Sequence, residues 1–264
     1  MTRSHVVGRV AAGAIVLALA PIMAEAQRGG SPPAPQSPRL AAPIDLTGYW
    51  VSLVTEDWRY RVATPPKGDY NSVPLNPAGR KAADAWDPAR DEAAGEQCKA
   101  YGVGGVMRLP GRLHVVWQDD RTLTVETDAG TQVRTLRFGP ATTGASDWQG
   151  SSQASWDRME GPMGAGLLFG GGGFGVGNTA GGSLKVVTKG MKPGYLRKNG
   201  VPYSADAVIT EYFDYHKEPN GDEWFTVTTI VRDPQYLREP FVTSSDFKKQ
   251  RDATGWRPAP CSAR

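Results

Sequence analysis

Three short runs of alternating apolar and polar residues lie close together between Arg112 and Phe138. Successive side chains of a β-strand point to opposite faces, so an alternation with period two predicts strands with one buried face. Asp119-Asp120 and Asp128-Ala129-Gly130 separate the runs, and Asp and Gly tolerate the backbone angles of hairpin turns. The stretch therefore predicts an antiparallel meander, and it constrains the fold more than any other part of the chain.

Further strands are expected on both sides of this meander. Each is a run of apolar, aromatic or β-branched residues bounded by turn residues. They cover residues 44–54, 148–157, 183–188, 205–216, 223–232 and 241–244. The total of about eight to ten strands predicts an all-β, mainly antiparallel fold. We expect the sheet to close or to curve strongly, because closure removes exposed edges. We expect a single lipocalin-like barrel or a strongly curved sheet.

Two short helices are expected before the meander. Asn76-Pro77 and Asp87-Pro88 each combine a favourable N-cap residue with proline at the first helical position. These signals predict helices over residues 77–86 and 88–94, the second ending at Gly95. We interpret the helices as a lid or plug on the sheet.

The first 26 residues have the pattern of a signal peptide. Arg3 and Arg9 accompany an apolar run over residues 10–20, and Ala24-Glu25-Ala26 is a small-x-small cleavage pattern. The run is short for a bilayer span, although a helical membrane anchor is the alternative interpretation. We expect cleavage near Ala26, a flexible leader over residues 27–43 and a single β-barrel-like domain over residues 44–264. The mature protein is expected to be periplasmic or secreted, without a stable membrane span.

Charge gives no reason to expect a nucleic-acid partner. The chain has 30 Lys and Arg residues against 27 Asp and Glu residues. Cleavage would remove Arg3, Arg9 and Glu25, which leaves 28 against 26, a net charge of +2. A nearly neutral protein without a basic cluster lacks the electrostatic footprint of a nucleic-acid-binding protein.

Cys98 and Cys261 are the two cysteines of the chain. An isolated pair in an oxidising compartment favours a disulfide, with two free thiols as the alternative. Zinc would need further ligands nearby, and none are suitably spaced, so no metal site is expected. The bridge would close a long loop, which stabilises a fold by about 4 kcal/mol in the chain-entropy model.

Residues 161–182 form a Gly-rich insertion. No Lys-Ser/Thr follows its Gly pairs and no strand-to-helix transition is visible, so neither nucleotide-binding fingerprint is met and no cofactor is expected. We interpret the segment as a mobile surface insertion between two strands. Its apolar residues are candidates for contact with a membrane or a ligand: Leu167, Leu168, Phe169 and Phe174.

Glu211 is the carboxylate with the most apolar neighbours on its predicted strand face. Ile209 and Phe213 share that face, and such surroundings raise a carboxyl pKa and favour general acid or base catalysis. The alternative is a buried structural carboxylate paired with an arginine such as Arg134 or Arg232. Arg134 is also placed to form a cross-strand ion pair with Glu126.

His114 and His216 are the histidines that remain after cleavage. His114 alternates with Leu113 and Val115, so it faces the interior only if these large residues face outward. His216 ends a predicted strand and is expected to be exposed. No serine-nucleophile motif accompanies them, because Gly150-Ser151-Ser152 lacks the Gly-x-Ser-x-Gly frame. The catalytic candidates are His114 and Glu211.

Most tryptophans fall in or beside predicted strands. Aromatic walls with a few polar groups form small-molecule pockets, and the same residues also form cores. Trp148 and Trp156 are an even number of residues apart, which predicts that they share a strand face. The candidate ligand-binding residues are Trp50, Trp117, Arg134, Trp148, Tyr212 and Trp224.

An ordered set of landmarks covers nearly the whole mature chain. It comprises residues 45–50 (DLTGYW), 74–79 (PLNPAG), Cys98 with Gly102 and 107–110 (MRLP), 148–150 with 156–157, 184–188, 203–207 with 210–211, and 233–234 before Phe241. This set resembles a large group of uncharacterised secreted bacterial β proteins, and Gly48-x-Trp50 is similar to the start of lipocalins and calycins. The resemblance implies a secreted β fold and no particular activity. The Gly-rich insertion departs from that group, whose chains usually have a short turn there.

These observations lead to three functional hypotheses. The first is a lipocalin-like protein that binds a small apolar or aromatic molecule inside the barrel. The second is a cofactor-independent hydrolase, lyase or isomerase that uses Glu211 or His114 as general base. The third is an envelope protein-interaction module that uses the Gly-rich insertion.

Overall fold

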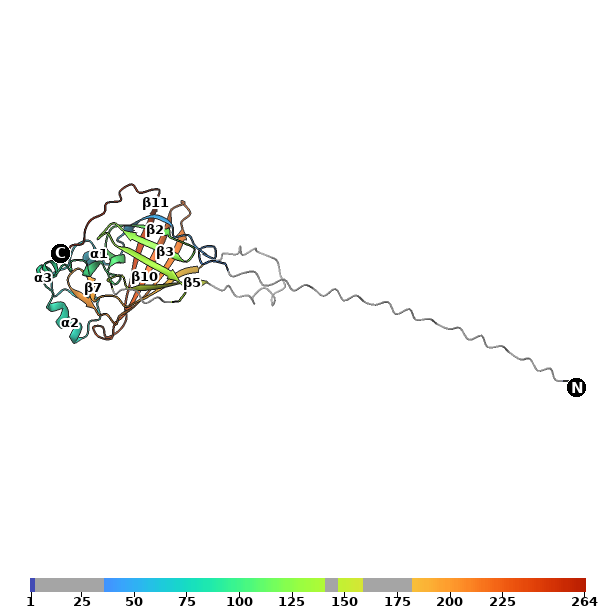
Figure 1. The fold of residues 1–264 in the computed structure, drawn as a ribbon, viewed down its shortest axis with the longest axis horizontal. Helices are drawn as coiled ribbons and strands as arrows, with labels where there is room; N and C mark the ends of the chain where they lie inside the picture. Colours follow the sequence, from blue (N-terminus) through green and yellow to red (C-terminus); the bar gives the residue numbers. More distant parts are fainter. Residues whose placement is uncertain (3–35, 141–146, 159–181) are drawn as a thin grey trace. The chain divides into compact units, whose positions relative to one another are not determined.

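The computed structural model describes residues 1–2, 36–140, 147–158 and 182–264 (Figure 1). Residues 36–264 form one compact unit, and the predicted signal peptide and most of the Gly-rich insertion lie outside the described residues. Residues 36–43 belong to the expected leader, yet part of it lies against the barrel: the Trp156 Nε1 donates to the Pro38 carbonyl at 2.7 Å.

The described residues form a closed barrel of nine strands, which confirms the predicted all-β class. In order around the barrel the strands are β1 (Gly48–Leu53), β11 (Phe241–Gln250), β10 (Glu223–Arg232), β9 (Val208–Lys217), β6 (Gly182–Lys189), β5 (Ser151–Arg158), β4 (Val133–Phe138), β3 (Thr122–Thr127) and β2 (Arg112–Trp117). All neighbours pair antiparallel except β4 and β5, where Leu136 lies opposite Ser152 in a parallel pair.

The predicted meander is confirmed as β2, β3 and β4. Leu113 and Val115 point into the barrel together with Leu123 and Val125 on the next strand. The second turn has Gly130 at φ 75°, a backbone angle that glycine adopts without strain. A Cβ at this position would also lie 2.2 Å from the Tyr101 ring, so no other residue fits the turn as built.

Large side chains fill the barrel. Trp50 and Leu136 are fully buried, and Phe225 and Phe247 are each 1 % exposed. A space wide enough for water beside these residues would leave part of their surface accessible. The inward side chains therefore form a packed core, as is typical of small barrels.

Short helices and a small hairpin gather at one end of the barrel (Figure 1). The elements are α1 (Trp58–Arg61), α2 (Pro77–Asp84), α3 (Pro88–Ala93), the 3-10 helices η1 (Lys99–Tyr101) and η2 (Val106–Arg108), and the hairpin β7 (Gly194–Arg197) and β8 (Val201–Tyr203). Asn76 and Asp87 cap α2 and α3 as predicted, accepting hydrogen bonds from Gly79 N and Ala89 N. No helix in the described ranges is both long and apolar enough to cross a membrane.

A second apolar core lies beneath these elements. Tyr203 is its largest fully buried side chain, in a cluster that also contains Leu196, Ile209 and Phe241. A Cβ on Gly102 or Gly194 would lie 2.3 Å or 2.5 Å from the Tyr203 hydroxyl, so the glycines allow the ring to approach the backbone. This core supports the end of the barrel where β2 begins.

Cys98 and Cys261 form the predicted disulfide, with Cα atoms 5.0 Å apart. Cys98 immediately precedes η1, and Cys261 lies close to the C-terminus. The bridge therefore ties the final segment of the chain to the same end of the barrel that carries the short helices.

Several sequence predictions differ from the structure. Trp148 and Trp156 do not share a strand, because β5 begins at Ser151 after Gly150 at φ 62°. The helix α1 and the hairpin β7–β8 were not expected, and β11 continues to Gln250 beyond the predicted end at residue 244.

Candidate functional site

Arg134 and Glu211 pair with each other inside the barrel. Arg134 Nη1 donates to Glu211 Oε1 at 3.0 Å and Nη2 donates to Oε2 at 2.5 Å, and both side chains are fully buried. The alternative pairing of Glu211 with Arg134 is confirmed. The expected Arg134–Glu126 ion pair is wrong, because Arg134 lies opposite Val125 in the strand register and points to the other face of the sheet.

His114 lies on the outer wall of the barrel. Its neighbours Leu113 and Val115 are the inward residues, so His114 faces away from the core. Its Nδ1 lies 2.8 Å from Glu126 Oε2, and its ring stacks on Tyr49 at 4.3 Å. His114 and Glu211 are therefore on opposite faces of the wall and cannot act on one substrate.

The aromatic ligand candidates are scattered. Trp50 belongs to the barrel core. Trp117 ends β2 at the end of the barrel opposite the short helices, with its ring centroid 5.5 Å from that of Phe138. Tyr212 and Trp224 are on the outer wall, where they contact Lys185 and His216. Trp148 lies outside the barrel strands, beneath Lys192. The structure brings no two of these aromatic side chains together around one cavity.

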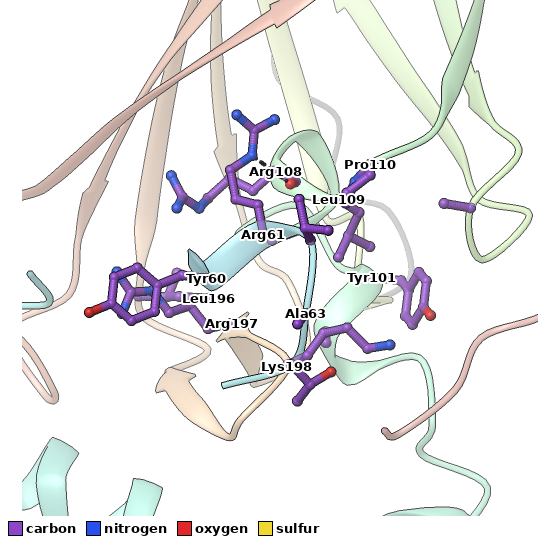
Figure 2. Close-up of a pocket in the computed structure, with 15 residues that line it drawn as sticks. Tyr60, Arg61, Ala63, Tyr101, Arg108, Leu109, Pro110, Leu196, Arg197 and Lys198 are labelled. Carbon is purple, nitrogen blue, oxygen red and sulfur yellow. Dashed lines mark hydrogen bonds between the residues drawn. The ribbon is translucent and has the colours of Figure 1, made fainter. Parts of the chain in front are cut away.

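A pocket of about 260 Å³ lies instead at the end of the barrel where β2 begins. Its walls come from the segment that contains α1, from η1 and η2, and from the β7–β8 hairpin. Figure 2 shows Tyr60 and Tyr101 on opposite sides of this view, with Arg61 and Arg108 nearest the barrel strands. We call it the arginine pocket, after the three arginines that line it: Arg61, Arg108 and Arg197.

The Arg61 side chain joins α1 to the barrel. Its Nε donates to the Arg108 carbonyl at 2.9 Å, its Nη2 to Ser52 Oγ at 3.2 Å and its Nη1 to Glu56 Oε1 at 2.7 Å. Every nitrogen of this guanidinium therefore has a partner. Arg61 holds the wall of the pocket in place.

Arg108 and Arg197 are paired less completely. Arg108 Nη2 donates to Asp57 Oδ2 at 2.9 Å, and Arg197 Nη1 donates to the Asn71 carbonyl at 2.7 Å. Arg197 also lies over the Tyr60 ring, with its Cζ atom 4.2 Å from the ring centroid. Arg108 Nη1 and Arg197 Nε and Nη2 are buried without a hydrogen-bond partner among the described residues.

Charged groups of both signs surround the pocket. Arg61 and Arg108 form salt bridges with Glu56 and Asp57, whose side chains are 35 % and 32 % exposed. Asp69 and Asp246 act on Arg197 and Arg61 from a greater distance. Burial and, to a smaller extent, the like charge of Arg108 lower the pKa of Arg197 to about 10. Burial also lowers the pKa of Arg61, which Glu56 partly offsets. With a pKa of about 10, Arg197 remains cationic at neutral pH.

Apolar and aromatic groups complete the lining. Tyr60, Tyr101 and Leu196 are among these lining residues, together with Leu109 and Pro110. Lys198 adds a fourth cation, whose Nζ lies 5.6 Å from the Tyr101 ring centroid. An apolar wall with a few convergent polar groups is the usual composition of a small-molecule site.

Other hollows lack this combination. One of about 950 Å³ lies beside the β9–β10 turn and is lined by surface residues such as Asp222, Lys248 and Asp252. Over the described part of the chain, no group of three or more His, Cys, Asp or Glu residues is arranged to hold a metal ion.

Sequence reasoning missed the arginine pocket because its residues are distant along the chain. Arg61, Arg108 and Arg197 converge only through the tertiary fold. One signal was present: arginine alternates with aromatic residues in Trp58-Arg59-Tyr60-Arg61, and Tyr195-Leu196-Arg197 repeats the combination. Cation–π pairing makes such combinations informative when they are buried.

The fold and site together define a nine-stranded β-barrel protein with a packed interior and a cationic pocket at one end. Comparison of the chain with protein-family models, with curated proteins and with solved structures finds no match.

Proposed function

We propose that this protein binds a small organic molecule with an aromatic or apolar body in the arginine pocket. The observation that carries the proposal is the pocket itself, where Tyr60, Tyr101 and Leu196 form an apolar lining beside buried cations. The inside of the barrel, where we first expected the ligand, is filled by Trp50, Phe225 and their neighbours.

The pocket volume limits the size of the ligand. A volume of about 260 Å³ is slightly below the usual range for ligand sites, which begins at about 300 Å³. It suits one aromatic ring or a short aliphatic chain. We propose that binding takes place outside the cytoplasm, which the signal-peptide pattern and the disulfide support.

A pocket-filling variant tests this proposal. Ala63 is an exposed residue that lines the pocket, so Ala63→Trp is expected to fill it without disturbing the core. Val116→Trp is the matched control, because Val116 is exposed on the barrel wall and does not line the pocket. Thermal unfolding and intrinsic fluorescence are measured with a panel of small aromatic and aliphatic compounds.

The proposal predicts that a compound which stabilises the wild-type protein also stabilises Val116→Trp but has no effect on Ala63→Trp. A compound that stabilises all three proteins equally binds elsewhere and contradicts the site. If no compound in the panel has an effect on the wild-type protein, the binding function is contradicted.

A further inference from the structure

We infer that the ligand of the arginine pocket is an anion, and that Arg108 and Arg197 bind its carboxylate or phosphate group. This inference rests on the proposed small-molecule function and names the chemical class of the ligand.

The unpaired atoms of Arg197 have the geometry of an oxyanion site. Nε and Nη2 both lack a partner, and these two nitrogens form one edge of the planar guanidinium. That edge presents two parallel N–H groups, which match the two oxygens of a carboxylate or of a phosphate. Nη1, on the other side of the group, is already bound to the Asn71 carbonyl.

Arg108, which is close enough to Arg197 to act on its charge, supplies a second unpaired donor. Its Nη1 is buried without a partner, while its Nη2 binds the Asp57 carboxylate. The Asp57 contact shows that this guanidinium binds a carboxylate. Arg108 and Arg197 both lie near the Phe241 ring, with Cζ atoms 6.0 Å and 5.9 Å from its centroid.

The charge balance points the same way. Arg61 has Glu56 and Arg108 has Asp57, but no described carboxylate forms a salt bridge with Arg197, on which Asp57 and Asp69 act only from beyond salt-bridge distance. A buried cation without a salt bridge is costly, and buried donors without acceptors add to that cost. A bound anion would supply both the missing charge and the missing acceptors.

The Tyr60 side chain, on α1, covers the Arg197 guanidinium, whereas Arg61 fixes the same segment to the barrel. Asp57, at the start of α1, has φ 52° and its side chain forms no cap to the helix. Trp58 and Val62 are 68 % and 66 % exposed, so this short helix contributes little to the core. Tyr60 lies over Arg197, and its displacement would open the arginine edge to the pocket.

Isothermal titration with benzoate, benzamide and inorganic phosphate tests the inference at low ionic strength. Benzamide has the shape of benzoate without its charge. We expect benzoate to bind about tenfold or more tightly than benzamide, because charge-assisted hydrogen bonds to a buried arginine are lost with the amide. Phosphate binding without benzoate binding would assign the same donors to a phosphate ligand.

Arg197→Met and Arg108→Met are each expected to abolish the preference for benzoate over benzamide, or to abolish phosphate binding. Arg137→Met is the matched control, since Arg137 is exposed on the outer wall, and it is expected to bind like the wild-type protein. Circular dichroism confirms that each variant is folded, and the wild-type comparison of the two compounds does not depend on the variants.

Equal affinity for benzoate and benzamide would overturn the anion inference and leave the small-molecule function intact. Failure of benzoate and phosphate to bind at all would also overturn it. The proposed function is judged separately, by the response of Ala63→Trp to the wider compound panel.

Discussion

The protein buries arginines in two regions, and the regions differ in how completely the guanidinium groups are paired. Inside the barrel, Arg134 and Glu211 satisfy each other through two hydrogen bonds and leave only Nε of Arg134 unpaired. In the arginine pocket, Arg197 is 4 % exposed, and among the described residues its side chain forms one hydrogen bond, to a backbone carbonyl. The two side chains are similarly buried, but among the described residues only Arg134 has a salt bridge to a carboxylate.

We interpret this difference as that between a structural pair and a proposed binding site. A paired buried charge is stable as it stands and offers nothing to a ligand, whereas an unpaired one retains donors for an incoming anion. Glu211 attracted attention as a catalytic candidate because of its apolar surroundings, but Arg134 already uses both of its carboxylate oxygens. The next four predictions test this contrast.

The largest effect is expected when the barrel pair is broken. Glu211→Gln leaves Arg134 as a buried cation without a counterion, so the free energy of unfolding should fall by about 3–5 kcal/mol. The double variant Arg134→Met with Glu211→Leu should recover most of that loss, because it removes both charges. Urea denaturation measures both. A loss below about 1 kcal/mol for Glu211→Gln would show that the pair is not structural.

The Tyr203 hydroxyl, a neutral buried group in the second core, is expected to have an intermediate and pH-dependent effect on the free energy of unfolding. Burial raises the pKa of the Tyr203 hydroxyl well above its usual range, and this hydroxyl has no partner among the described residues. The unfolded chain ionises near pH 10 while the folded protein keeps the proton, so stability is full below pH 10 and falls as pH rises. Tyr203 should contribute about 1.4 kcal/mol to this loss per pH unit.

Tyr203→Phe removes that contribution. Urea denaturation of the variant and the wild-type protein at neutral pH and near pH 11 measures the difference directly. The variant should lose less stability between the two conditions than the wild-type protein does. Identical losses would place the Tyr203 hydroxyl in contact with solvent and contradict its burial.

The arginine pocket should respond in the opposite way to the barrel pair. Arg197→Met removes an unpaired buried charge, so the free energy of unfolding should change by no more than about 1 kcal/mol, or rise. Thermal and urea unfolding without added anions measure this change. A loss as large as that of Glu211→Gln would show that Arg197 is a structural residue, like Arg134.

The smallest effect is expected on the outer wall. His114→Gln removes a partly exposed contact to Glu126, so stability should change by about 0.5 kcal/mol or less. Binding in the arginine pocket should be unchanged, because His114 does not line it. Altered binding in this variant would reopen the assignment of His114 to a functional site.

Local patterns in the sequence were sufficient to predict much of the fold. Period-two alternation predicted β2, β3 and β4, and the Asn76 and Asp87 caps predicted α2 and α3. These features depend on neighbours within a few residues. The disulfide was predicted by elimination, since the chain has only two cysteines.

The arginine pocket could not be predicted in this way. Whether a strand residue such as His114 faces inward depends on which side of the sheet closes on itself, and this is a property of the whole barrel. Pro193-Gly194 and Asn199-Gly200 indicated turns, and the short strands of the β7–β8 hairpin, which carries Arg197, were not recognised between and after them. The meeting of Arg108 with Arg197 requires the ends of several strands to be in place.

A crystal structure of the protein with para-bromobenzoate tests the central claim most directly, because bromine is located by its anomalous scattering. We predict bromine in the arginine pocket, with the carboxylate accepting hydrogen bonds from Nε and Nη2 of Arg197. Bromine inside the barrel, or a carboxylate that avoids Arg197 and Arg108, would contradict the account.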